Sequence, residues 1–175
     1  MTHSTRQKIF LVGMMGVGKT MVGRHIAQKL EIKLIDNDLD MAERIGSTID
    51  GLALLSIEQL HELELGQAQF LLDEVGPFVA GLAASIGDHF TVLEKLQREG
   101  QVIYLRADVK TLTDRFQSGL VGRQDRVSDH SEFIRNAFDR RDPVFYACAG
   151  HVIEADQPVE TVLRKIDALL PTLAP

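Results

Sequence analysis

The chain has 175 residues, of which 45% are hydrophobic and 25% charged, a balance typical of one domain with a full apolar core. The formal net charge is −6 and no long basic run occurs, which argues against nucleic acid as a partner. No apolar stretch is long enough to cross a bilayer, and the polar first eight residues do not resemble a secretory signal. Cys148 is the single cysteine, which excludes an internal disulfide. We therefore expect a cytoplasmic monomer of one domain, residues 1–175, without nucleic acid or membrane partners.

The predicted elements alternate between strand and helix along the chain. In order, hydrophobic periodicity and turn residues predict strand 8–12, helix 18–30, strand 32–35, helix 38–45, helix 56–75, strand 77–80, helix 88–98, strand 101–105, helix 109–117, loop 118–129, helix 131–141, strand 151–154 and helix 158–170. Ser56 and Gln59 suit a capping box, and Pro143 is expected to end the helix before it. This alternation predicts an α/β fold, a three-layer α/β/α sandwich around about five parallel strands. Ligands then bind at the carboxyl ends of the strands.

The most specific motif follows the first strand. Gly13-Met14-Met15-Gly16-Val17-Gly18-Lys19-Thr20 reads G-x-x-x-x-G-K-T and leads into a helix. The glycines let backbone N–H groups converge on phosphate oxygens, Lys19 supplies a cation to the β/γ-phosphates, and the Thr20 hydroxyl suits Mg²⁺. The motif predicts a P-loop that binds ATP with Mg²⁺.

Carboxylates follow the second strand, in Asp36-Asn37-Asp38-Leu39-Asp40. One carboxylate at this position can hold Mg²⁺ through water, and another can take a proton from a substrate hydroxyl. The alternative is structural, with Asp38 capping the next helix. We favour function for Asp36 and Asp38, and a place near the positive helix end for Asp40.

Arginines surround the predicted loop. Arg115, Arg123 and Arg126 could bring a guanidinium to the γ-phosphate when the loop closes, or form a solvated cluster with nearby aspartates. Arg140-Arg141-Asp142-Pro143 follows, where an arginine could bind an anionic substrate or offset the helix dipole. The six histidines show no metal-ligand spacing.

These motifs together resemble the shikimate kinase family. Gly13 to Gly23 with Arg24 is similar to the family's G-x-M-G-x-G-K-[ST]-x-V-G-R, and Asp36-Asn37-Asp38 to its D-x-D. Gly46-Ser47-Thr48-Ile49 resembles G-x-[ST]-I, and Arg141-Asp142-Pro143 resembles R-x-P.

The resemblance implies roles for individual residues. Lys19, Asp38 and Arg123 would be catalytic, with Asp38 as the base and Arg123 on a lid at about 118–129. Thr20 and Asp36 would hold Mg²⁺, while Asp38, Gly81 and Arg141 would meet the substrate. The residues expected to bind ATP are Gly13, Met14, Met15, Gly16, Val17, Gly18, Lys19, Thr20, Met21, Arg115, Arg123 and Pro158.

Several positions differ from the family pattern. An ungapped alignment puts Glu62 where the family has a carboxylate-binding arginine, and Leu82 and Ala83 replace two glycines after Gly81. Three functions therefore stay open. The first is an ATP-dependent kinase acting on shikimate or a related polyol, with ATP or ADP and a small hydroxylated acceptor as its partners. The others are a kinase for a sugar or cyclitol without a carboxylate, and an ATP-binding regulatory module with vestigial catalysis.

Overall fold

The computed structural model describes residues 7–118 and 129–173. Its five strands form one parallel sheet in the order β2-β3-β1-β4-β5. The strands are β1 (Lys8–Val12), β2 (Lys33–Ile35), β3 (Phe78–Gly81), β4 (Gln101–Arg106) and β5 (His151–Glu154). The predicted number of strands and their parallel arrangement are confirmed.

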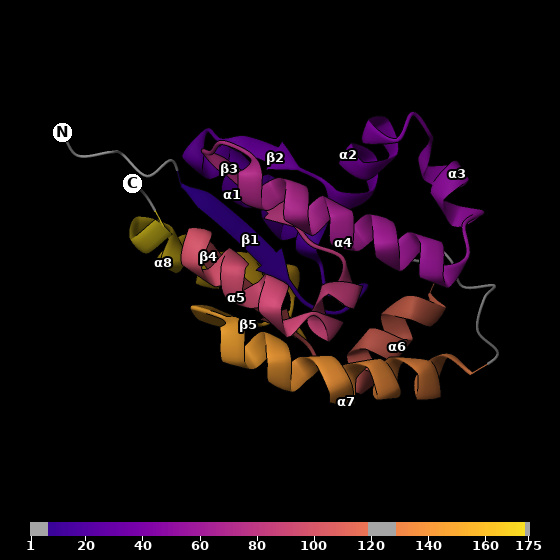
Figure 1. Cartoon of the computed structure of the whole chain (residues 1–175). Helices are drawn as coiled ribbons and strands as arrows, with labels where there is room; N and C mark the ends of the chain where they lie inside the picture. The colour runs from indigo at the N-terminus through magenta and orange to yellow at the C-terminus, as the bar shows by residue number, and fades with distance from the viewer. Residues whose placement is uncertain (1–6, 119–128, 174–175) are drawn as a thin grey trace.

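Helices cover both faces of this sheet. They are α1 (Lys19–Leu30), α2 (Asn37–Arg44), α3 (Ile49–Ala53), α4 (Ile57–Asp73), the 3-10 helix η1 (Ala84–Asp88), α5 (Phe90–Glu99), α6 (Val109–Gln117), α7 (His130–Cys148) and α8 (Val159–Leu173). In Figure 1, α4 and α5 lie in front of the strands and α8 lies behind them.

Side-chain alternation along β1 explains the three layers. Ile9 and Leu11 point into one apolar cluster with Val22 of α1 and Ile166 of α8. Phe10 and Val12, between them in sequence, point into the opposite cluster with residues of α4 and α5. A strand buried on both faces has no polar side, which is why it reads as a continuous apolar run.

The end of α7 differs from the prediction. The expected helix stop before Pro143 is wrong, because α7 continues to Cys148 with Pro143 inside it. Proline removes one helix hydrogen bond, but Arg141, Phe145 and Cys148 on the same helix are all buried against other elements. Tertiary packing therefore outweighs the local cost of the proline.

Two short elements were absent from the prediction. Helix α3 has five residues, and its N-cap is Thr48, whose side chain accepts a hydrogen bond from the Gly51 N–H. The 3-10 helix η1 also has five residues. Elements this short give too few periodic positions to be recognised from sequence. In contrast, the capping box of Ser56 and Gln59 at the start of α4 is confirmed.

Candidate active site

The P-loop connects β1 to α1 at the carboxyl edge of the sheet. Gly13, Gly16 and Gly18 all have positive φ angles, of 143°, 74° and 107°. A Cβ on Gly13 would lie 2.4 Å from the carbonyl oxygen of Leu105 on β4, so a side chain is excluded there. The loop thus has the backbone shape that turns N–H groups inward toward an anion at the start of α1.

Lys19 lies where the P-loop faces residues of three other helices. Its Nζ donates to the carbonyl oxygens of Gly13 and Met14, at 2.8 and 2.9 Å. Burial lowers the pKa of Lys19 to about 8, while the negative charges of Asp38 and Glu64 oppose that shift and the positive charge of Arg141 adds to it. The Lys19 ammonium therefore interacts electrostatically with charged residues of α2, α4 and α7.

The two carboxylates after β2 are placed differently from each other. Asp36 is the N-cap of α2 and accepts from the Leu39 N–H at 3.4 Å, so the alternative that Asp38 caps this helix is wrong. Thr20 Oγ1 donates to Asp36 Oδ2 at 3.1 Å. Asp38 lies in the first turn of α2 and accepts from the Asn37 side chain at 3.0 Å.

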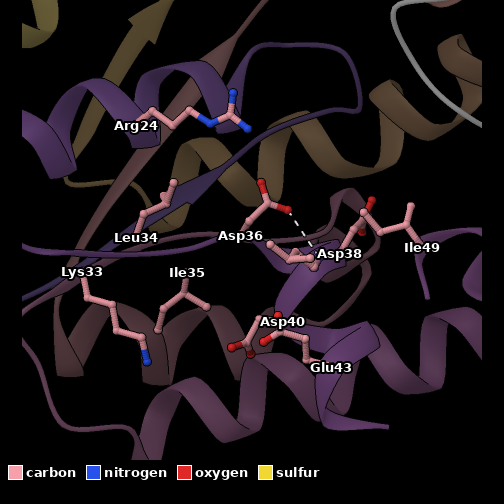
Figure 2. A pocket seen from close by; sticks show the side chains of 10 residues that line it. Arg24, Lys33, Leu34, Ile35, Asp36, Asp38, Asp40, Glu43 and Ile49 are labelled. Atoms are coloured by element: carbon pink, nitrogen blue, oxygen red, sulfur yellow. Dashed lines mark hydrogen bonds between the residues drawn. The ribbon is translucent and has the colours of Figure 1, made fainter. Parts of the chain in front are cut away.

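A cavity of about 490 Å³ opens beside these carboxylates. Figure 2 shows Arg24 of α1 on one side of it and Asp40 and Glu43 of α2 on the other. Asp36 and Asp38 both belong to its lining. The predicted metal and base residues therefore border an open space rather than the packed core.

Asp40 and Arg44 join α2 to α4. The buried Gln67 of α4 donates to Asp40 Oδ2 at 2.5 Å and accepts from Arg44 Nη1 at 2.6 Å. The Arg44 guanidinium also stacks 3.7 Å above the Phe70 ring. Asp40 thus has a tertiary partner that its sequence neighbours do not reveal, and Arg44 is engaged with α4.

On α4 the carboxylate that faces the site is Glu64. It is 6% exposed and accepts from Ser85 Oγ of η1 at 2.5 Å. Glu62, two residues earlier, is exposed, because that offset turns a side chain to the other side of a helix. The alignment that placed Glu62 in the substrate site is therefore corrected by the structure.

The segment after β3 brings backbone close to the P-loop lysine. A Cβ on Gly81 would lie 3.7 Å from the Lys19 Cβ. Leu82, which follows, is fully buried in the apolar cluster under α4 and α5, so its side chain fills core rather than site.

Arg141 of α7 is 4% exposed and pairs with Asp88, the last residue of η1. Its Nε and Nη2 donate to Asp88 Oδ2 at 3.0 and 2.6 Å, and Arg140 Nε donates to Oδ1 at 3.4 Å. Burial favours the neutral acid, but these hydrogen bonds outweigh it and hold the pKa of Asp88 below its usual value. Sequence reasoning missed Asp88, since nothing local marks it.

Arg115 of α6 bridges the P-loop and the segment after β5. Its Nη1 donates to the carbonyl oxygens of Gly16 and Val17 at 3.3 and 3.4 Å, and its Nη2 donates to that of Ala155 at 2.8 Å. Pro158 lies just before α8, and its carbonyl accepts from the Thr161 and Val162 N–H groups. The structure thus places Arg115 beside the P-loop, and its role in binding ATP stays a prediction.

Arg123, Arg126 and nearly all of the predicted lid lie outside the described residues. Within residues 7–118 and 129–173, no three His, Cys, Asp or Glu side chains form a metal cluster. Over the same part of the chain, no helix is both long and apolar enough to span a membrane.

We compared the sequence and the structure of this chain with those of known proteins. The family described as "Shikimate kinase" matches residues 15–170. A shikimate kinase of Sulfurihydrogenibium sp. is 31% identical over 168 residues, which cover 91% of this chain and 98% of that protein. A shikimate kinase structure from Acinetobacter baumannii in complex with shikimate superposes with a TM-score of 0.82 at 25% identity, covering 96% of this chain and 94% of that one.

A second solved structure shares the fold alone. A gluconokinase from Sinorhizobium meliloti superposes with a TM-score of 0.61 at 17% identity, over 97% of this chain and 94% of that one. The motifs, the site and the family match agree with one another: the chain belongs to the shikimate kinase family and is an ATP-dependent kinase that transfers phosphate to a hydroxyl.

Proposed function

We propose that the chain transfers the γ-phosphoryl group of ATP to a hydroxyl of shikimate or a closely related small polyol. The observation that carries this proposal is the setting of Lys19. Its ammonium is held by P-loop carbonyls and feels the charges of Asp38, Glu64 and Arg141. A P-loop cation under the influence of the proposed base and the proposed acceptor arginine supports in-line transfer, which requires donor and acceptor to be held together.

Each residue then has a chemical role. Asp38 accepts the proton of the acceptor hydroxyl as its oxygen bonds to the γ-phosphorus, and the bond from that phosphorus to the bridging oxygen of ADP breaks. Lys19 stabilises the negative charge on the phosphate oxygens. Arg141 binds the acceptor carboxylate, and Arg123 closes over the phosphates, a role that follows from the family resemblance.

The residues present fit Mg²⁺ as a companion of ATP. Thr20 and Asp36 offer a hydroxyl and a carboxylate oxygen 3.1 Å apart, and hard oxygen ligands suit this ion. Magnesium at kinase sites needs only one or two protein ligands, because phosphates and water supply the others. When bound, it would neutralise phosphate charge during transfer.

One observation favours a second candidate, a kinase for an acceptor without a carboxylate. The guanidinium of Arg141 is already paired with Asp88, so an acceptor carboxylate has to share or displace a partner. A sugar or cyclitol would need only hydroxyl contacts. We rank it second, because the matching family and the relative that is 31% identical are shikimate kinases.

An acceptor panel tests the proposal. Purified full-length protein with Mg-ATP is assayed for ADP release with shikimate, quinate, gluconate and cyclitols. We expect the highest kcat/KM with shikimate, and a loss of roughly 100-fold or more in kcat for Asp38→Asn with ATP binding retained. A cyclitol preferred over shikimate would support the second candidate. A panel without acceptor-dependent ADP release, with ATP binding intact, would show an ATP-binding module instead.

A further inference from the structure

Asp88 forms a direct ionic contact with Arg141. Two guanidinium nitrogens of Arg141 donate to one Asp88 oxygen, while Arg140 reaches the other oxygen. Arg141 is almost fully buried, whereas the Arg140 side chain is 59% exposed. Asp88 is therefore anchored from the solvent side and presents its charge to the buried arginine.

The 3-10 helix η1 has little freedom to move away from α7. A Cβ on Gly87 would lie 2.7 Å from Arg141 Cβ and Cγ, so the two backbones are nearly in contact. At its other end η1 is tied to α4 by the hydrogen bond from Ser85 to Glu64. These contacts hold Asp88 beside Arg141.

We propose that Asp88 is a specificity-determining residue, which weakens the hold of Arg141 on an acceptor carboxylate and widens the acceptor range toward uncharged polyols. This inference rests on the proposed function, in which Arg141 binds the acceptor. Within that function, Asp88 lessens the contribution of the acceptor carboxylate to binding relative to that of the hydroxyl groups.

The physical reason is competition for one cation. Two carboxylates on one guanidinium repel each other, and near a protein surface that repulsion corresponds to a tenfold or larger change in binding at separations of a few ångströms. Glu64 is buried near Lys19 of the same site and adds further negative charge. An uncharged acceptor of the same shape does not experience this repulsion.

The test compares shikimate with its methyl ester, which has the same ring and no charge. Dissociation constants are measured by calorimetry with Mg-ADP present, for the wild type, Asp88→Asn and Asp88→Ser. We expect each substitution to tighten shikimate binding about tenfold and to leave ester binding unchanged. Asp88→Glu keeps the charge and should retain the weak binding of shikimate.

Two further variants serve as controls. Glu62→Gln removes an exposed carboxylate from α4 and should change neither constant. Arg141→Met should weaken shikimate binding while sparing the ester, which checks that Arg141 is the carboxylate partner. Thermal unfolding of each variant verifies that it folds. If Asp88→Asn does not fold, the comparison is made with Asp88→Ser.

The outcomes separate this inference from the proposed function. If the Asp88 variants weaken shikimate binding, Asp88 orients Arg141 instead and the inference is overturned. Equal changes for acid and ester, no change for either, or no binding of shikimate by any variant would overturn it too. If the acid-to-ester ratio shifts as expected but no phosphoryl transfer occurs, the proposed function fails and the role of Asp88 stands.

Discussion

Gly87 shows how a single residue without a side chain sets the distance between two elements. A Cβ there would meet Arg141 at 2.7 Å and the Phe145 ring at 2.8 Å, both closer than real Cβ contacts allow. Because Arg141 and Phe145 are buried on a long helix, neither can simply turn aside. The glycine therefore positions Asp88, its neighbour, against Arg141.

We predict that Gly87→Ala lowers the free energy of unfolding by about 1–3 kcal/mol, because the added methyl forces η1 and α7 apart. Gly66→Ala is the matched control. Gly66 lies within α4 with nothing within 4 Å of an added Cβ, so the same change there should stabilise the protein by about 0.5–1 kcal/mol. Urea unfolding measures both, and equal effects at the two sites would contradict the close contact at Gly87.

At the scale of elements, α2 carries Asp38 but is short and packs mainly on α3 and α4. Its polar connection to α4 passes through Gln67, which is 2% exposed and bonded to both Asp40 and Arg44. A buried amide that satisfies a carboxylate and a guanidinium together fixes the helix more exactly than apolar contact does. Gln67 thus links α2, the helix that carries Asp38, to α4.

We predict that Gln67→Leu destabilises the protein by about 1–3 kcal/mol, because Asp40 and Arg44 lose a buried partner. It should also lower kcat, since Asp38 is then less well placed, while ATP affinity at the P-loop is kept. Gln69→Leu, an exposed position on the same helix, is the control and should leave kcat unchanged. Steady-state kinetics give both values; an unchanged kcat in Gln67→Leu would remove the positioning role.

For the whole molecule, ionic contacts tie α7 to the rest of the fold. Asp142 accepts hydrogen bonds at 2.7 Å from both Tyr104 and Arg106 of β4, while Arg141 next to it binds Asp88 of η1. Burial opposes ionisation of Asp142, but the hydrogen bonds from Arg106 and Tyr104 prevail and hold its pKa below the usual value. Both aspartates are thus charged in the folded state at neutral pH.

This arrangement predicts acid sensitivity. A carboxylate with a lowered pKa in the folded state stabilises the fold above its unfolded pKa of about 3.9, and that stabilisation is lost as pH falls through the folded value. The free energy of unfolding should therefore decline below about pH 4. Asp142→Asn should be less stable at pH 7 and show a shallower decline, by up to about 1.4 kcal/mol per pH unit.

Urea unfolding of the wild type and Asp142→Asn at a series of pH values measures this decline. Asp73→Asn, at the exposed end of α4, is the comparison variant and should follow the wild type. Parallel curves for Asp142→Asn and the wild type would contradict the linkage.

The amino-acid sequence by itself determined the β1–P-loop–α1 unit, the alternation of strands and helices, and the family. These depend on short-range physics: an apolar strand, glycines with positive φ at 13, 16 and 18, and a helix start that binds anions. Most element bounds were predicted within a few residues for the same reason.

Only the tertiary structure decided which side chains surround the proposed acceptor site. Which α4 carboxylate faces the site, Glu64 rather than Glu62, follows from the rotation of that helix against η1, which an ungapped alignment cannot give. The helix through Pro143 and the pairing of Asp88 with Arg141, 53 residues apart, likewise require α7 to be packed in place. The P-loop is formed by adjacent residues and can be recognised from sequence. The residues proposed to bind the acceptor lie on distant helices, so they acquire their partners only when the sheet has brought those helices together.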